Sequence, residues 1–180
     1  MPEKTDFDTL VAAVTDGGDL KEAGFTHWLT PNTGADNSSG FTAVGAGYRS
    51  NTFTTNFSGL TNYNILGCAT ARTETDVYFL HLQYDSTALY VGNAYKKYTG
   101  YSIRLLWDGT GTPSSTMTDE DGNTYDVVQV DTQYWTVQNW KCTKLNDGTA
   151  LDKVTDNTDW KTATTGDLYY CAYANDENNV

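Results

Sequence analysis

The aromatic residues of this chain are spread over short segments separated by turn-forming residues, a pattern that disfavours long helices. The 180 residues include 13 Tyr, 5 Trp and 6 Phe but only 3 Pro. Aromatic and β-branched residues favour strands, whereas Asn, Asp, Gly and Ser favour turns. The sequence therefore predicts an α+β fold with short antiparallel strands, two helices and long loops.

Two hairpins are predicted where alternating apolar residues flank a polar turn. The first joins Asp76–Tyr84 to Ala88–Gly92 through residues 85–87. The second joins Thr124–Val130 to Gln133–Gln138 through residues 131–132. These hairpins are expected to form the regular part of the sheet structure.

One further strand, one tight turn and one short helix are expected elsewhere. Tyr101–Trp107 alternates as a closing strand, and Asn146-Asp147-Gly148 favours a tight turn. A short helix is expected from residue 155 or 156 through Trp160 to Thr162, because Asp and Asn favour a helix start.

A longer helix is predicted at the beginning of the chain. Thr5 is the expected N-cap, with Asp8 three residues later as in a capping box. The Asp16-Gly17-Gly18 sequence is expected to end the helix. Its apolar face consists of Phe7, Leu10, Val11 and Val14.

The sequence GTGTPSST, Gly109–Thr116, is typical of a linker. We therefore divide the chain into residues 1–107, a linker over 108–117, and residues 118–180. A chain of this length buries roughly 70 % of its unfolded surface, which suffices for one domain or two complementary halves.

Long motifs lie on both sides of this linker. Asp119–Trp140 reads DEDGNTYDVVQVDTQYWTVQNW, and KLNDGTALDKVTDNTDW and TTGDLYYCAY follow over residues 144–160 and 164–173. They resemble the first half of the Fibrobacter succinogenes major paralogous domain, an extracellular module of bacteria and their phages related to the C-type lectin and formylglycine-generating folds. The second half of that module is similar to residues 17–49 and 96–106 (KKYTGYSIRLL), which come first here. The resemblance implies a C-type lectin-like fold with residues 1–107 as its second half and residues 118–180 as its first.

The resemblance also implies that one core segment of the module is missing from this chain. The module has an aromatic-rich segment with its own core strand between its two halves, and nothing in this sequence corresponds to it. If one chain folds its halves on each other, a core position stays empty and a strand edge stays unpaired. Either a neighbouring chain completes each subunit, giving a head-to-tail fibre or a closed oligomer, or the two halves complement each other within a monomer.

Charge and hydropathy limit the partners. A net charge of −12 repels phosphate backbones, so no nucleic-acid partner is expected. No window is apolar enough to span a membrane, and the charged start of the chain is unlike a secretory signal, so no membrane insertion is expected. We expect a protein of a virion surface or an extracellular cell surface.

Catalytic groups are sparse. His27 and His81 have no second imidazole or cysteine at metal-ligand spacing, and both are interpreted as structural. The reactive cysteine pair of the formylglycine-generating relatives has only Cys68 as a counterpart in the comparable half of this chain. No enzyme activity and no cofactor are expected.

Metal binding is also not expected. The sequence Asp119-Glu120-Asp121-Gly122-Asn123 begins like a calcium loop, but its glycine is misplaced and no glutamate closes it, so a turn before a strand is predicted. Asn32, Asp36 and Asn37 have suitable oxygens, yet the same residue types form Asx turns in glycine-rich loops.

Three cysteines, Cys68, Cys142 and Cys171, cannot all pair within one chain. In the resembled family the cysteine matching Cys171 often faces one in the final strand, where this sequence has Leu105. The resemblance therefore implies that this disulfide is absent.

A Tyr- and Asn-rich face is predicted between Thr70 and Tyr98, because tyrosine and asparagine are common on recognition surfaces. Arg49 and Arg104 are expected to anchor loops through carboxylates. The candidate ligand-binding residues are Tyr84, Asp85, Tyr90, Asn93, Tyr95, Lys96 and Tyr98.

Two functions are consistent with these patterns. The first is a non-catalytic recognition or adhesive module that binds a cell-surface glycan or protein. The second is a structural fibre or capsid-associated subunit that assembles with copies of itself or with other virion or surface proteins, by exchange of half-domains between chains.

Overall fold

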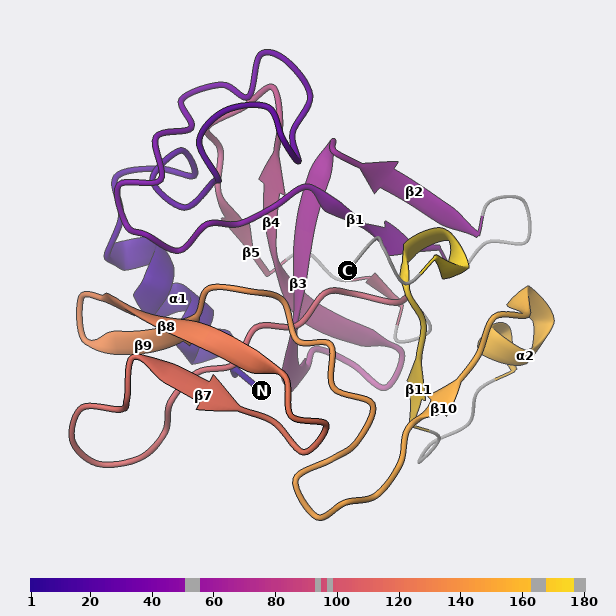
Figure 1. Cartoon of the computed structure of the whole chain (residues 1–180). Coiled ribbons are helices and arrows are strands. Elements are labelled where there is room, and N and C mark those ends of the chain that lie inside the picture. The colour runs from indigo at the N-terminus through magenta and orange to yellow at the C-terminus, as the bar shows by residue number, and fades with distance from the viewer. Residues whose placement is uncertain (51–55, 93–94, 97–98, 163–167, 177–180) are drawn as a thin grey trace.

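The computed structural model describes residues 1–50, 56–92, 95–96, 99–162 and 168–176, with only the backbone described at residues 95–96. Its described residues form a mixed, sheet-rich α+β fold with two α-helices (Figure 1). None of the helices in this part of the chain has the length and hydropathy needed to cross a bilayer.

The largest sheet has the strand order β2-β1-β3-β4-β5, with β6 paired to one end of β4. β1 pairs antiparallel with β2 and parallel with β3, and β4 pairs antiparallel with β3, β5 and β6. The bounds of these strands are Ala46–Arg49 (β1), Phe57–Leu60 (β2), Tyr63–Ala71 (β3), Asp76–Gln83 (β4), Tyr90–Val91 (β5) and Tyr95–Lys96 (β6).

Two smaller sheets come from the C-terminal part of the chain. β7 (Thr116–Thr118), β8 (Thr124–Val130) and β9 (Gln133–Thr136) form an antiparallel sheet. β10 (Asp152–Lys153) and β11 (Tyr169–Tyr170) form a short parallel pair. A 3-10 turn, η1 (Tyr173–Asn175), follows β11. Thr116 and Met117, the last residues of the expected linker, begin β7.

Both strand pairings that the sequence predicts are confirmed. β4 pairs with β5, and β8 pairs with β9 around Asp131, which has a positive φ of 52°. The Asn146–Gly148 turn is confirmed as well, since the amide of Leu145 donates to the carbonyl of Thr149 across it. The predicted tight turn at residues 85–87 is wrong, because the innermost pair of β4 and β5 is His81 with Tyr90, which leaves a longer connection over residues 82–89.

The predicted strand over Tyr101–Trp107 is wrong as a regular strand. Ser102 bridges to Leu66 in β3, whereas Leu106 bridges to Trp135 in β9. The segment therefore crosses from one sheet to the other and pairs continuously with neither. It joins the large sheet to the β7–β9 sheet.

The first helix, α1 (Lys4–Ala12), begins and ends earlier than predicted. Its N-cap is Glu3, whose amide donates to the Asp6 carboxylate at 2.7 Å in a reciprocal capping box, so Thr5 is not the cap. The helix ends at Ala12, before Asp16. The second helix, α2 (Asn157–Lys161), is confirmed with Asp156 as its N-cap, since that side chain accepts from the amides of Thr158 and Asp159.

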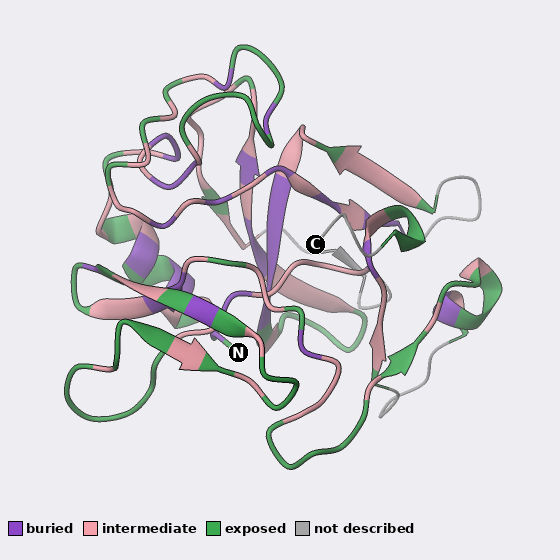
Figure 2. Ribbon diagram, in the orientation of Figure 1, coloured by how far each residue is buried: buried purple, intermediate pink, exposed green. Residues whose placement is uncertain are grey.

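One hydrophobic core contains residues from both sides of the expected linker (Figure 2). Phe7 and Leu10 of α1 pack toward β3 and β4, where Leu66 and Leu80 are fully buried. Trp135 of β9 enters the same core and stacks on Phe7 with ring centroids 5.9 Å apart. The two parts of the chain therefore share one hydrophobic core.

Replacement of Trp135 tests this shared core. Trp135→Ala removes a fully buried indole, and we expect it to lower the free energy of unfolding by about 3–5 kcal/mol. Trp107→Ala is the matched control, because Trp107 is 47 % exposed and its loss should cost less than about 1 kcal/mol. Urea unfolding followed by circular dichroism measures both; equal losses would contradict the shared core.

Candidate functional site

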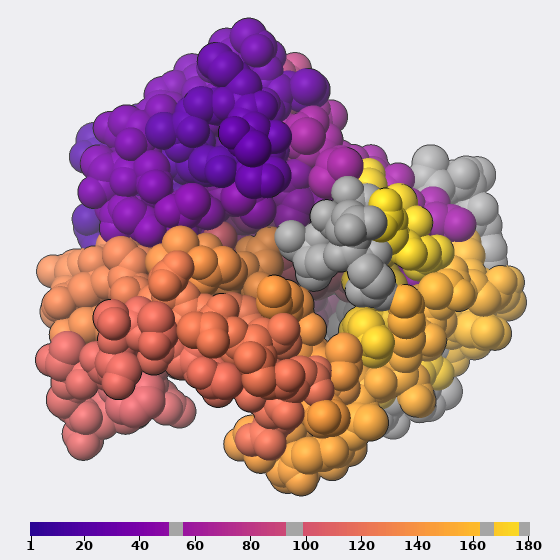
Figure 3. All heavy atoms as spheres, viewed as in Figure 1, coloured from indigo at the N-terminus to yellow at the C-terminus, as the bar shows by residue number. Residues whose placement is uncertain are grey.

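A large cavity lies where the two parts of the chain meet. Its volume is about 1310 Å³, and its lining includes β1, the 99–108 segment, β9, the 139–146 loop and β11. Figure 3 shows the hollow between orange atoms of the β7–β9 region and yellow atoms near the C-terminus.

Aromatic side chains from distant parts of the sequence line this cavity. Trp107 is 47 % exposed and lies at the end of the segment that crosses between the sheets. Other aromatic lining residues are Tyr48, Phe57, Tyr101, Tyr134, Trp135, Trp140, Trp160, Tyr169, Tyr170 and Tyr173. Rigid aromatic surfaces of this kind provide large contact area at low entropic cost.

Charged residues of the lining are mostly cationic, although the chain as a whole carries a net charge of −12. They are Arg49, Lys141 and Lys144 against Asp108. Lys144 forms an ion pair with Asp121 at 2.8 Å. The Lys144 ammonium, together with the amide and hydroxyl of Thr143, holds the pKa of Asp121 well below its usual value. The ion pair and hydrogen bonds of Asp121 hold the 141–146 loop against the turn before β8.

Arg49 holds one wall of the cavity in place. Its guanidinium donates to the carbonyls of Val154, Thr155 and Asp156, more than a hundred residues along the chain. It also stacks 4.3 Å from the centroid of the Trp160 ring. The wall formed by β10, α2 and β11 therefore depends on one buried cation of β1.

Arg104 joins the two parts of the chain beside the cavity, between the lining residues Ile103 and Leu105. The guanidinium donates to the carbonyls of Phe41 and Thr42 on one side, and to the Thr136 carbonyl and the Asn139 amide oxygen on the other. Burial lowers the pKa of Arg104 to about 9, because desolvation penalises the charged form, and the group stays charged at neutral pH. The expected carboxylate partners of Arg49 and Arg104 are wrong: in both cases backbone carbonyls, with one amide oxygen, accept the hydrogen bonds.

The predicted ligand face is only partly within the described residues. Tyr84 packs against the hydrophobic core, whereas Asp85 and Tyr90 are exposed. Tyr90 is stacked on His81 with ring centroids 6.1 Å apart. Asn93 and Tyr98 lie outside the described residues, as do the side chains of Tyr95 and Lys96, whose backbone forms β6.

His81 lies among aromatic rings on β4. The centroids of Tyr63 and Phe79 lie 5.4 and 6.4 Å from its ring, and Nε2 is buried without a hydrogen-bond partner. Desolvation lowers the pKa of His81 below its ordinary value of 6.5. These surroundings suit a neutral packing residue better than a general base exchanging protons with solvent.

His27 lies in an exposed loop, where Nδ1 is 2.9 Å from the Glu22 carboxylate. Neither histidine lines the cavity. The described part of the chain contains no group of three or more His, Cys, Asp or Glu residues arranged to hold a metal ion.

Most of the proposed turn residues use their side-chain oxygens locally. Asp119 accepts from the amides of Asp121 and Asn123 and from the Tyr125 hydroxyl, which confirms the turn before β8. Asp36 accepts from the amide of Ser38, two residues on, as in an Asx turn, whereas Asn37 accepts from the more distant Thr42 amide. Asn32 differs, since its amide oxygen is buried without a hydrogen-bond partner among the described residues.

All three cysteines line the cavity as thiols. Cys68 and Cys142 are buried, and desolvation raises the pKa of the Cys68 thiol. Leu105, the residue at the place of the family's second cysteine, is another lining residue. A raised pKa makes Cys68 a poor nucleophile, so its role here is apolar contact.

The sequence did not predict this cavity as the binding site. Its walls come from segments far apart in the chain, and only the expected vacancy in the core gave a signal for it. Comparison with protein-family models, with curated proteins and with solved structures finds no match for this chain. The family resemblance therefore stays a prediction.

Arg49 gives a direct test of how the cavity wall is held. Arg49→Met preserves volume but removes donors to three carbonyls, and we expect a loss of about 3 kcal/mol in unfolding free energy. Limited proteolysis should then cleave first between residues 141 and 176. Arg72→Met, at an exposed residue of the connection between β3 and β4, is the control. Unchanged protection of the C-terminal segment in Arg49→Met would refute this role.

His81 predicts a pH dependence of stability. Because its pKa is lowered in the folded state, the unfolded chain binds the proton more tightly, so stability is complete above pH 6.5 and decreases as the pH falls below it. His81→Phe should reduce this loss, measured as the urea midpoint at a series of pH values. His27→Gln should keep it. An identical pH profile for His81→Phe and the unaltered protein would contradict the prediction.

Proposed function

We propose that this chain is a non-catalytic recognition and assembly module with a C-type lectin-like fold, displayed on a cell or virion surface. Its binding site is the aromatic cavity between the two parts of the chain, and its ligand is an extended protein segment or a glycan. The observation that carries this proposal is the cavity itself, about 1310 Å³ in volume and lined by aromatic side chains.

The size of the cavity favours a polymeric ligand. Sites for small molecules and cofactors usually have volumes of roughly 300–1,000 Å³. This cavity is larger and has walls from several strands and loops. Tryptophan and tyrosine are the residues that contribute most to binding energy at protein interfaces.

The chemistry of the lining favours binding over catalysis. It has no imidazole, and two of its three cations already have partners: Arg49 is buried against carbonyls and Lys144 pairs with a carboxylate, whereas Lys141 is exposed. The thiol with the best-defined environment, Cys68, has a raised pKa. Binding through aromatic surface needs none of the activated groups that catalysis requires.

The lectin-like part of the proposal rests on the motifs in the sequence. A void between the two parts of the chain is what the missing core segment of a permuted module would leave, and the described fold has the expected short strands, two helices and long loops.

The alternative, a structural subunit that exchanges halves with its neighbours, is favoured by one observation: Arg49 and Arg104 bind the second part of the chain through backbone carbonyls, which any copy can supply.

Variants of the cavity lining and of the predicted face show which of the two surfaces binds the ligand. Random extended peptides displayed on phage and a printed oligosaccharide array are the probes. Trp107→Ala should weaken binding of the selected probe by at least about tenfold, the effect of losing about 1.4 kcal/mol. Tyr90→Ala, at the exposed aromatic residue of the predicted face, should bind as the unaltered protein does.

Two outcomes would contradict this assignment. Loss of binding in Tyr90→Ala with normal binding in Trp107→Ala would place the site on the Tyr- and Asn-rich face. A failure of both probe libraries, together with assembly of the chain into a fibre, would favour the structural alternative.

A further inference from the structure

The loop from Glu22 to Asn32 carries exposed apolar side chains. Phe25 is 60 % exposed and Leu29 is 46 % exposed. Leu60, in β2, is 39 % exposed and lies near Leu29, whose amide donates to the carbonyl of the adjacent Thr61. Single exposed apolar residues are common, but three at one end of a molecule form a surface that favours an interaction.

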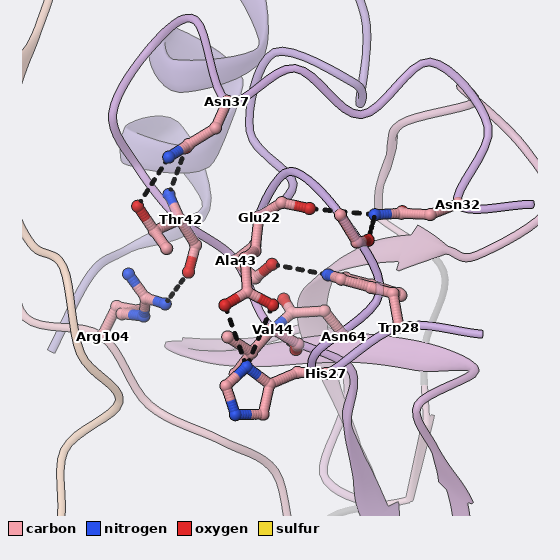
Figure 4. A network of polar contacts seen from close by, with 11 residues as sticks. Glu22, His27, Trp28, Asn32, Asn37, Thr42, Ala43, Val44, Asn64 and Arg104 are labelled. Carbon is pink, nitrogen blue, oxygen red and sulfur yellow. Dashed lines mark hydrogen bonds and ion pairs between the residues drawn. The ribbon is translucent and has the colours of Figure 1, made fainter. Parts of the chain in front are cut away.

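Hydrogen bonds hold this loop in one conformation (Figure 4). The Asn32 amide donates to the carbonyls of Glu22 and Gly24 at 2.9 and 2.7 Å. The Trp28 indole donates to the Ala43 carbonyl at 2.9 Å, and His27 contacts Glu22. Phe25 and Leu29 are therefore presented to solvent from a fixed backbone, which lowers the entropic cost of binding.

A third buried cation supports the base of the loop. The Lys21 ammonium donates to the carbonyls of Thr33, Gln83 and Ser86 at 2.7, 3.1 and 3.0 Å. The backbone of Lys21 is fully enclosed, and its ammonium lies 5.7 Å from the Trp28 ring centroid. The loop is thus fixed to the turn after β4.

In Figure 1 most of residues 13–45 lie at the top, whereas β7–β9, the 140–150 loop and the β10–β11 pair surround the lower part. The two regions meet at β1, where Ala46 lines the cavity and pairs with Leu60 of β2. The loop surface and the cavity are different patches, so a contact between the loop of one copy and the cavity of another is head to tail.

Apolar character and charge of the two regions are complementary. The cavity offers apolar and aromatic walls, and its cations Arg49, Lys141 and Lys144 exceed Asp108 and the Asp121 carboxylate that pairs with Lys144 by one positive charge. Near the protruding loop, Glu22, Asp19 and Asp36 carry negative charge, and Lys21 is buried. Complementary charge favours encounter of these two regions over encounter of two like regions.

We propose that the Glu22–Asn32 loop of one copy inserts Phe25 and Leu29 into the aromatic cavity of the next copy, so that the chain assembles head to tail. The inference rests on the cavity being the binding site and names a second copy of this chain as its occupant. The contact is heterologous, so repetition gives a ring if it closes and a fibre if it does not.

Complementing variants test this assembly by sedimentation. The loop variant Phe25→Asp with Leu29→Asp keeps its cavity, and the cavity variant Leu145→Arg keeps its loop. Each should sediment as a monomer, whereas the unaltered protein should form larger species whose size increases with concentration. An equimolar mixture of the two variants should form a one-to-one complex, since one loop and one cavity stay intact.

Tyr90→Asp is the matched control, because it places a charge at another exposed aromatic residue and should leave assembly unchanged. Thermal melting followed by circular dichroism shows whether each variant folds; the one-to-one complex is a readout that two unfolded variants cannot give.

Two results would overturn the inference. One is a monomeric unaltered protein at concentrations up to roughly 100 µM, a level at which even weak specific contacts associate. The other is a mixture of the folded variants that remains monomeric. If the protein is monomeric but Trp107→Ala still loses peptide or oligosaccharide binding, the cavity is a site for another molecule, and self-assembly alone is refuted.

Discussion

Buried cations that donate to backbone carbonyls hold this structure together. Arg104 contacts four acceptors from two distant parts of the chain, Arg49 contacts three consecutive carbonyls, and Lys21 contacts three more. A buried charge is costly unless its hydrogen bonds are satisfied. Movement of a carbonyl away from its cation would leave the charge unpaired, so each cation keeps the surrounding carbonyls in position. Because the acceptors are main-chain groups, the loops they belong to keep their shape with little help from their own side chains.

This arrangement explains how a cavity can persist between two packed regions. The shared core at Phe7 and Trp135 and the Arg104 contacts join the large sheet to the β7–β9 sheet on one side. On the other side Arg49 and Trp160 hold the β10–β11 pair against β1. The space between these two anchor points is not filled by the described residues, and its aromatic walls are held apart by the same contacts. A fixed apolar cavity and a fixed apolar loop are what a binding and assembly module needs.

Local sequence signals predicted a good part of the fold. The β8–β9 hairpin, α2 with its Asp156 cap and the Asn146–Gly148 turn depend on residues close in sequence, and all three are confirmed. The β4–β5 pairing is confirmed too, but without the predicted turn at residues 85–87. β3 gave no clear signal, because it is enclosed on both faces and lacks alternation. Its Gly67 lies against the Tyr101 ring, a contact that only tertiary structure creates. The start of α1 was misplaced because a glutamate and an aspartate formed the capping box in place of the commoner threonine.

The site was less accessible to sequence reasoning than the fold. Tyrosine and asparagine content indicated a face near Tyr90, but the cavity is lined by Arg49, Trp107 and residues 139–146 and 169–173, whose proximity depends on contacts across more than a hundred residues. We infer that both parts of the chain form one cooperative unit around this cavity. Amide hydrogen exchange at a series of low denaturant concentrations tests this cooperativity. We expect the slowest amides of β3, β4, β8 and β9 to exchange through one opening, with the same free energy and the same denaturant dependence. Exchange of β8 and β9 through a separate, cheaper opening while β3 and β4 stay protected would contradict it.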